Sequence, residues 1–204
     1  RLRQFMTQLC TGWDVATVRE IVGDTLHHIV DPLVYDEAVS LIEEHQAAGR
    51  DVIIVSTSGA EVVGPISQML GADDFVATRL EIVDGHYTGK IDYYAYAEEK
   101  ARAITELAEQ RGYDLAESYA YSDSITDVHM LRVVGHPSAV NPDKELRKIA
   151  VESGWPVLTF ARPVTLKSRI PVRHALATLA VGGAVAGIVW AAGSRRRRLT
   201  PAAS

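Results

Sequence analysis

The sequence predicts an α/β fold in which a parallel sheet carries helices on both faces, a Rossmann-like three-layer α/β/α arrangement. Short apolar runs alternate along the chain with stretches of helical periodicity, and this alternation is typical of an open parallel sheet. The run Val52-Ile53-Ile54-Val55 is β-branched throughout, as expected of a strand that is buried on both faces. Ligands of such sheets bind where the strands end, so the polar residues after each strand are the candidates for function.

Length and composition fit one ordinary globular domain with a short addition. The chain has 204 residues, of which 47% are hydrophobic and 23% are charged, so a core of useful size can be buried. The formal net charge of -5 argues against a nucleic-acid partner. The single cysteine, Cys10, excludes a disulfide framework or a cysteine zinc site built from this chain. Because the sequence begins at Arg1 and shows no signal peptide, we interpret it as a fragment or a truncated chain, with a processed mature protein as the alternative.

The first thirty residues predict two helices. The apolar residues of the first recur at helical spacing: Leu2, Phe5, Met6 and Leu9. Gly12 interrupts the pattern, Asp14 is a candidate N-cap for the second helix, and Asp31-Pro32 ends that helix.

The next segment, residues 32–160, predicts the layered core. A helix that ends near Gly49 precedes the strand at 52–55, and a helix over 60–70 follows it. Asp84-Gly85 stands between two alternating runs and predicts a β-hairpin. The remaining predicted elements are a helix over 96–111, a strand over 118–121, a helix over 127–133, a strand over 138–140, a helix over 143–153 and a strand over 157–160.

Hydroxyl side chains follow the strand at 52–55 directly, in Ser56-Thr57-Ser58-Gly59. Hydroxyls and free backbone amides at a strand end that enters a helix form an anion site, so Ser56 and Thr57 are candidate phosphate ligands. An ordinary N-cap loop is the alternative, since Ser and Thr are common caps. Lys100, early in the helix after the hairpin, could neutralise the same anion as a compact positive charge, although most helical lysines are solvated.

Two carboxylates four residues apart follow the strand at 118–121. They are Asp123 and Asp127, within the run Ser122-Asp123-Ser124-Ile125-Thr126-Asp127. Oxygen ligands of this kind suit a hard cation, and Mg²⁺ is bound through one or two carboxylates together with substrate phosphate and water. The alternative is that one of the two aspartates simply caps the following helix.

These clusters, taken in this order, resemble one family over about residues 30–160. A β-branched strand that ends in Ser56, a lysine further along the chain and a Ser-Asp-Ser-x-x-Asp strand end are similar to the haloacid dehalogenase (HAD) superfamily hydrolases. The segments Val134-Gly135-His136-Pro137 and Val140-Asn141-Pro142-Asp143 point to subfamily IB, the phosphoserine-phosphatase-like branch, in which a helical cap is inserted early in the fold. More typical phosphoserine phosphatases have Gly-Asp-Gly where this chain has Ser122-Asp123-Ser124. That departure indicates a sister group and leaves phosphoserine open as the substrate.

The resemblance implies a role for each matching residue. Ser56 is expected to hydrogen-bond the transferring phosphoryl group, with Thr57 beside it, and Lys100 to neutralise the phosphoryl oxygens and the carboxylate of the nucleophile. Asp123 is expected to bind Mg²⁺, and Asp127 to hold the metal's water shell or to orient Lys100. Each role stabilises negative charge that spreads over the phosphoryl oxygens.

The resemblance also implies a nucleophile that this chain does not contain. In the family, the first carboxylate of an Asp-x-Asp-x-Thr/Val run on the first strand attacks phosphorus and forms an aspartyl phosphate, and the second protonates the leaving alcohol. No Asp-x-Asp run occurs in the 204 residues. We therefore expect residues 1–31 to be the C-terminal part of the cap and residues 32–160 to be a HAD-like core that lacks its first strand. The nucleophile is expected upstream of Arg1, so the chain as given is expected to be inactive.

The C-terminal segment predicts a membrane anchor. Residues 175–192 carry no charge and are followed by Arg195-Arg196-Arg197-Arg198. An uncharged run of this length with an interfacial Trp190 and basic flanks is a candidate transmembrane helix. We predict a linker over 161–174, a membrane-spanning helix over 175–192 and a basic tail over 193–204. A helix packed on the domain or a disordered tail is the alternative, and the family resemblance places the catalytic domain on the cytoplasmic side.

The sequence therefore predicts a magnesium-dependent phosphomonoester hydrolase that works through an aspartyl phosphate. Its substrate would be a small phosphate or, given the predicted anchor, a lipid phosphate. A membrane-anchored, inactive phosphate-binding protein is the second hypothesis. A phosphotransferase, in which an alcohol resolves the intermediate instead of water, is the third.

Overall fold

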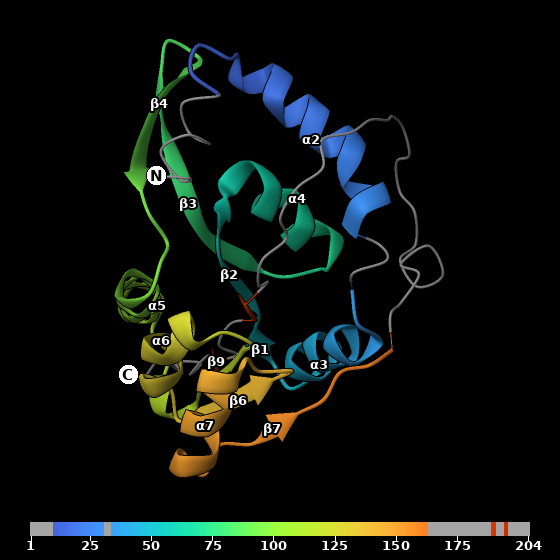
Figure 1. Cartoon of the computed structure of the whole chain (residues 1–204), viewed down its shortest axis with the longest axis vertical. Coiled ribbons are helices and arrows are strands. Elements are labelled where there is room, and N and C mark those ends of the chain that lie inside the picture. The colour runs from blue at the N-terminus through green and yellow to red at the C-terminus, as the bar shows by residue number, and fades with distance from the viewer. Residues whose placement is uncertain (1–9, 31–33, 163–188, 191–193, 196–204) are drawn as a thin grey trace, which may run out of the picture.

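The computed structural model describes residues 10–30, 34–162, 189–190 and 194–195, and Figure 1 shows how their elements are arranged. The helices are α2 (Val15–Val30), α3 (Asp36–Ala47), α4 (Ala60–Met69), α5 (Glu98–Arg111), α6 (Val128–Arg132) and α7 (Lys144–Ser153), with short 3-10 helices at Leu115–Glu117 and Ile125–Asp127. The strands are β1 (Arg50–Asp51), β2 (Ile53–Gly59), β3 (Asp74–Val83), β4 (His86–Tyr93), β5 (Tyr119–Ser122), β6 (His136–Val140), β7 (Val157–Leu158), β8 (Val189–Trp190) and β9 (Ser194–Arg195).

The main sheet has the strand order β4-β3-β2-β8-β5-β6-β7. β2 pairs parallel with β3, and β6 pairs parallel with β5 and with β7. This parallel ladder confirms the predicted α/β sheet. Because parallel strands end at the same edge, the C-terminal ends of β2 and β5 lie at one edge of the sheet.

Apolar side chains pack on both faces of the sheet. On one face Ile53 and Val55 pack with residues of α5, α6 and α7. On the other face Ile54 packs with residues of α3 and α4. Successive residues of β2 point to opposite layers, as a pleated strand requires, so a run that is apolar at every position is buried on both sides.

The predicted hairpin connects β3 and β4, which pair antiparallel. Its turn residues Asp84 and Gly85 have φ of 49° and 76°. Two successive positive φ angles give a turn whose twist matches the flanking strands, and Asp-Gly tolerates this conformation well. The hairpin prediction is confirmed.

Helix α2 begins at the predicted cap. The Asp14 carboxylate accepts a hydrogen bond from the Thr17 N–H over 2.7 Å, which satisfies one of the free amides of the first turn. The segment before the helix is tied to the hairpin, because the Gly12 N–H donates to the Tyr87 carbonyl over 2.8 Å. The helix predicted before Gly12 falls almost entirely outside the described residues, and the assignment of residues 1–31 to a cap stays a prediction.

The predicted transmembrane helix over 175–192 also lies mostly outside the described residues. Its two described residues, Val189 and Trp190, form strand β8 instead of a helix, and β8 pairs antiparallel with β2 and β5. β-branched and aromatic residues favour this extended conformation, and the backbone groups of the two neighbouring strands supply pairing partners. β9, from the predicted basic tail, pairs with β1. Within the described ranges no helix combines the length and apolar character needed to span a bilayer.

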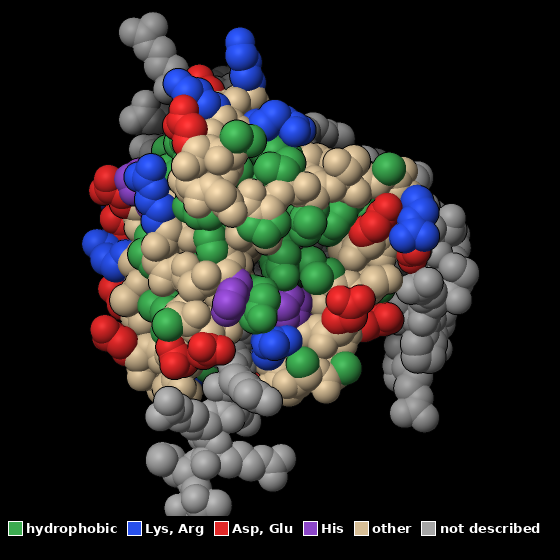
Figure 2. All heavy atoms as spheres, turned by 90° about the horizontal axis from the view of Figure 1, so that it is seen from below, with side chains coloured by type: hydrophobic (Ala, Val, Ile, Leu, Met, Phe, Trp, Pro, Cys, Tyr) green, Lys and Arg blue, Asp and Glu red, His purple; other side chains and the backbone are tan. Residues whose placement is uncertain are grey.

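Histidine, tyrosine and arginine side chains pack together near the N-terminal ends of β5 and β6, at the sheet edge opposite the one where β2 and β5 end. His45 Nε2 and the Tyr121 hydroxyl share a hydrogen bond of 2.9 Å. His136 stacks on Tyr119 with ring centroids 4.4 Å apart, and Arg50 lies 4.7 Å from the centroid of the same ring. Figure 2 shows the molecule from below, with histidine side chains beside a basic one among apolar side chains. Burial lowers the pKa of His45, and the charge of Arg50 lowers it further, which favours the neutral imidazole.

Candidate active site

The C-terminal half of β2 carries the first predicted site residues, so the strand extends beyond the predicted 52–55 and includes Ser56 to Gly59. Ser56 is buried, with 3% of its surface exposed, and its Oγ accepts a hydrogen bond from the Ser58 N–H over 3.2 Å. Helix α4 begins at Ala60 without a side-chain cap, so its first backbone amides are open to a bound anion. The last residues of β2 and the first turn of α4 therefore offer a hydroxyl and backbone N–H groups at the C-terminal end of a central strand.

Thr78 of β3 joins the C-terminal half of β2 to the segment that leads into α5. Its Oγ1 donates to the Thr57 carbonyl over 2.7 Å and accepts a hydrogen bond from the Ala95 N–H over 3.2 Å. Ala97, the N-cap of α5, has φ 50° and ψ -118°, a backbone conformation that costs about 1–3 kcal/mol in a residue with a side chain. Such strain persists where surrounding contacts hold the chain, and here it directly precedes the helix that carries Lys100.

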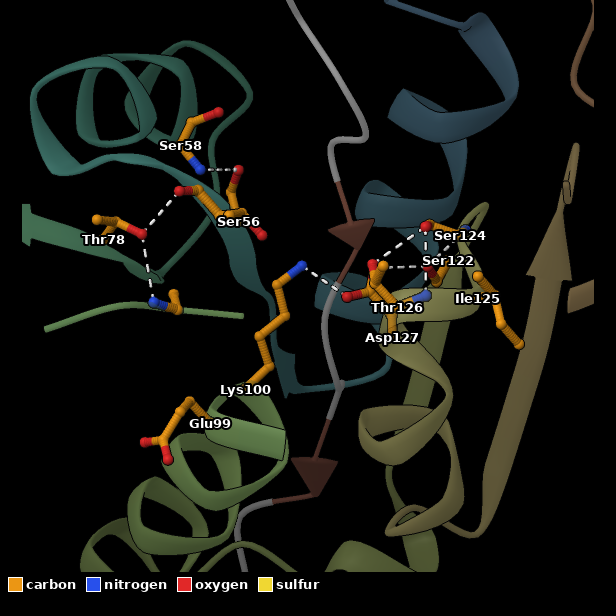
Figure 3. A network of polar contacts seen from close by, with 12 residues as sticks. Ser56, Ser58, Thr78, Glu99, Lys100, Ser122, Ser124, Ile125, Thr126 and Asp127 are labelled. Carbon is orange, nitrogen blue, oxygen red and sulfur yellow. Dashed lines mark hydrogen bonds and ion pairs between the residues drawn. The ribbon is translucent and has the colours of Figure 1, made fainter. Parts of the chain in front are cut away.

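Lys100 and Asp127 form a buried ion pair. Their side chains are 2% and 1% exposed, and Lys100 Nζ lies 2.7 Å from Asp127 Oδ1. The second oxygen of Asp127 accepts a hydrogen bond from Ser122 Oγ over 2.8 Å. Figure 3 shows Lys100 reaching from α5 into the space between Ser56 of β2 and Asp127, which follows β5. Because both oxygens of the carboxylate are hydrogen-bonded, the pair holds the ammonium group in one place.

Asp123 belongs to the same loop and has an unsatisfied carboxylate oxygen. Its Oδ1 is buried, and none of the described residues donates a hydrogen bond to it. Burial raises the pKa of the Asp123 carboxyl, and the nearby carboxylates of Asp127 and Asp143 raise it further. A buried carboxylate oxygen without a donor costs free energy, and a divalent cation bound to it would remove that cost. Asp123 therefore fits as one ligand of Mg²⁺.

Asp123 accounts for only part of a metal coordination sphere. Across the described part of the chain, no three His, Cys, Asp or Glu side chains are placed to hold a metal ion together. Mg²⁺ usually keeps several waters and takes one or two carboxylates plus substrate phosphate, so a single protein carboxylate here is compatible with such a site.

Asp143, between β6 and α7, supports the loop that carries Asp123. Its carboxylate accepts hydrogen bonds from the Ile125 N–H and the Leu146 N–H, each over 2.7 Å. Its own N–H donates to the Asp123 carbonyl over 2.8 Å. One aspartate thus caps α7 and fixes the loop that carries Asp123.

The structure brings some of the predicted site residues together and leaves others apart. Lys100 and Asp127 are in contact, and Asp123 lies in the loop that carries Asp127. Among the described residues, no hydrogen bond joins Ser56 or Thr57 to this group, and the two sets share only the edge of the sheet at which β2 and β5 end.

Sequence reasoning did not assign supporting roles to Ser122, Thr78 and Asp143. Ser122 stands out in the sequence only as part of the Ser-Asp-Ser run, and Asp143 only as a motif residue at a helix start. Thr78 has no local signal, because its partners Thr57 and Ala95 are 21 and 17 residues away in the sequence.

The fold and this site define the class of protein. The model of the haloacid dehalogenase-like hydrolase family matches residues 1–132, more than half of the chain, so the chain belongs to this family. The match includes the first thirty residues, which the motif resemblance did not cover.

Relatives within the family include named phosphatases. The chain is 56% identical to the "inhibition of morphological differentiation protein" of Streptomyces azureus, over 96% of this chain and 74% of the relative. It is 54% identical to a "probable phosphatase" of Mycobacterium tuberculosis, over 98% of this chain and 72% of the relative. It is 35% identical to a phosphoserine phosphatase of the same species, over 87% of this chain and 58% of the relative.

A solved structure supports the same fold. A Bordetella pertussis protein of unknown function shares 32% identity and a TM-score of 0.71, over 76% of this chain and 72% of that one. Together with the relatives, it confirms the predicted superfamily with its phosphoserine-phosphatase-like members.

Proposed function

We propose that this chain carries most of the site of a magnesium-dependent phosphomonoester hydrolase that forms an aspartyl phosphate. The observation that carries the proposal is the buried Lys100–Asp127 ion pair in company with Asp123, whose buried Oδ1 has no donor. A fixed positive charge and a cation ligand at one sheet edge are the groups that stabilise a phosphoryl group during transfer. The phosphatases named among the relatives support this reaction class.

Each residue has a defined task in this proposal. Ser56, Thr57 and the first amides of α4 bind the phosphoryl oxygens. Lys100 neutralises negative charge on the phosphoryl group and on the nucleophile, and Asp127 holds Lys100 in position. Asp123 is the residue that would help to hold Mg²⁺, and the bound ion would add positive charge next to the phosphoryl oxygens.

The attacking carboxylate must come from outside this set. No Asp-x-Asp run occurs in the 204 residues, and we propose that residues encoded before Arg1 supply it. If they do not, the inactive phosphate-binding protein becomes the better description. A phosphotransferase would use the same site with an alcohol in place of water.

We propose a small phosphomonoester as substrate. A phosphoserine-like compound is one candidate, because a relative is named a phosphoserine phosphatase. The lipid-phosphate option depended on a membrane helix, and the described residues of that segment form a strand. The structure therefore gives no support to a lipid phosphate as substrate.

The decisive experiment tests whether activity depends on Asp123 as a ligand of Mg²⁺. The protein is expressed with the residues that its gene encodes before Arg1, beside the 204-residue chain, and hydrolysis of p-nitrophenyl phosphate is followed at increasing Mg²⁺. The extended protein should be active with Mg²⁺, and Asp123→Asn should abolish that activity. Asp92→Asn, at a position that is 59% exposed in a surface ion pair with Arg79, is the matched control and should leave it unchanged. Full activity of Asp123→Asn would rule out the metal assignment.

A further inference from the structure

Ser122 occupies a buried position between the sheet and the ion pair. It is the last residue of β5, is 2% exposed, and lies in register with Ala139 of β6. Its side chain contacts Asp127, five residues further on in the 3-10 helix Ile125–Asp127. The hydroxyl therefore connects a strand of the rigid sheet to a carboxylate in the loop.

The direction of this hydrogen bond follows from the groups around it. Ser122 Oγ accepts a hydrogen bond from the Ser124 N–H over 3.2 Å. An ionised carboxylate is only an acceptor, so the Ser122 hydroxyl proton points to Asp127 Oδ2, 2.8 Å away. The backbone amide and the carboxylate thus leave the hydroxyl one orientation. Figure 3 shows Ser122, Ser124 and Asp127 together at this point of the structure.

We propose that Ser122 is a positioning residue, whose hydroxyl fixes Asp127 and through it the ammonium group of Lys100. Asp127 Oδ1 faces Lys100 Nζ at 2.7 Å and Oδ2 faces Ser122, so the two contacts together set the rotation of the carboxylate. Without the hydroxyl, the carboxylate can rotate and Lys100 loses its fixed partner. The expected effect of Ser122 on catalysis rests on the proposed function. Its role in fixing Asp127 and Lys100 follows from the two hydrogen bonds alone.

A neighbouring hydroxyl shows that this contact is specific. Ser124 shares a hydrogen bond of 3.0 Å with Thr126 Oγ1 and accepts one from the Thr126 N–H. These contacts stay within the loop, whereas the Ser122 hydroxyl reaches the carboxylate that pairs with Lys100. Ser122 is thus the serine of this loop that links the sheet to the ion pair.

The test removes one oxygen atom and has two independent readouts. The first is the ¹⁵N-detected ammonium signal of Lys100 in the 204-residue chain, which needs no activity. The second is the steady-state kinetics of the extended protein with p-nitrophenyl phosphate and Mg²⁺. The variants are Ser122→Ala, Ser122→Thr, which keeps the hydroxyl, and Ser118→Ala. Ser118 is a matched control, since it is a fully buried serine near the other end of β5 whose Oγ donates to the Asp114 carbonyl over 2.6 Å.

Ser122→Ala should shift or broaden the Lys100 signal and lower kcat about tenfold, the size expected when a charged group loses a hydrogen bond. KM should change much less, because the ammonium charge is still present. Ser122→Thr should restore both readouts, and Ser118→Ala should lower stability without moving either. Ser122→Cys, which keeps the volume but donates weakly, replaces the alanine variant should that variant not fold.

Three results would contradict the proposals, and each can be told from the others. An unchanged Lys100 signal in Ser122→Ala overturns the positioning role, whatever the kinetics show. A parallel loss in Ser118→Ala and Ser122→Ala also overturns it, because a general effect on the fold then suffices. An inactive wild-type extended protein contradicts the proposed phosphatase function, while the Lys100 signal still decides the inference about Ser122.

Discussion

Lys100 and Asp127 depend on each other because both charges are buried. Removing one partner from such a pair leaves an unpaired charge inside the protein, which costs about 3–5 kcal/mol, whereas replacing both by apolar residues can be nearly neutral. We expect Lys100→Met to lower the free energy of unfolding by about 3 kcal/mol. Lys100→Met combined with Asp127→Leu should restore part of that loss.

Urea unfolding of the two single variants and the double variant measures this coupling. The sum of the single effects should exceed the effect of the double variant by at least about 1 kcal/mol. Strict additivity would contradict an energetic link between the two side chains. Replacing Lys90 by Met serves as a control, since this lysine is 76% exposed in its surface ion pair with Glu81 and should have little effect.

The residue types at this site were predictable, but their burial was not. Lys100 and Asp127 follow from the motif order, and orienting Lys100 was one of two roles expected for Asp127. A lysine in a helix is most often solvated, and nothing local in the sequence shows that α5 turns this position toward the sheet. The 2.7 Å contact depends on the packing of two elements 27 residues apart.

Among the elements, the start of α7 has a double function. The Asp143 carboxylate caps this helix at Leu146 and also accepts the Ile125 N–H of the site loop. We expect Asp143→Ala to lower the free energy of unfolding by about 1–2 kcal/mol, as loss of an N-cap does. It should also speed hydrogen exchange at the Ile125 amide, because that donor loses its acceptor.

Hydrogen exchange followed by NMR separates these two effects. Asp114→Ala, at the N-cap of the short helix Leu115–Glu117, is the control and should leave exchange at Ile125 unchanged. Unchanged protection of Ile125 in Asp143→Ala would show that the cap does not support the loop.

Most of the elements were predictable because their signals are local. The β-branched strand at 52–55, the Asp84-Gly85 turn and the Asp14 cap each appear within a few residues of where they were expected. The structure differs at Trp190, where a segment predicted as a helix contributes a short strand. An apolar run fits either conformation, and pairing with β2 and β5 decides between them.

For the molecule as a whole, Glu37 joins parts of the chain that are far apart in sequence. Its carboxylate, at the start of α3, accepts hydrogen bonds from the backbone N–H groups of Ala161 and Arg162, beyond β7. Partial burial by itself raises the pKa of Glu37, but hydrogen bonds from its own backbone, Ala161 and Arg162 outweigh it and lower the pKa from 4.5 to about 2.

A lowered pKa makes stability depend on pH in a known direction. The unfolded chain binds a proton near pH 4.5 while folded Glu37 stays ionised to about pH 2. This residue therefore stabilises the fold above pH 4.5, and that contribution is lost as the pH falls toward 2. Wild-type stability should fall more steeply over this window than that of Glu37→Gln. Urea unfolding at several pH values checks this, with Glu43→Gln, an exposed residue of α3, as a control that should follow the wild type. Parallel curves for Glu37→Gln and the wild type would contradict the prediction.

By itself, the sequence determined the α/β class, the order of most elements and the residue types of the candidate site, because periodicity, turn chemistry and motif spacing are local properties. The tertiary structure decided which of those residues meet. The ion pair of Lys100 with Asp127 and the bridge from Thr78 to Thr57 join segments that are 27 and 21 residues apart. The burial of Lys100 and the donor-free oxygen of Asp123 depend on the exclusion of solvent, which only packing creates. Long-range contacts of this kind leave no periodic trace in the chain.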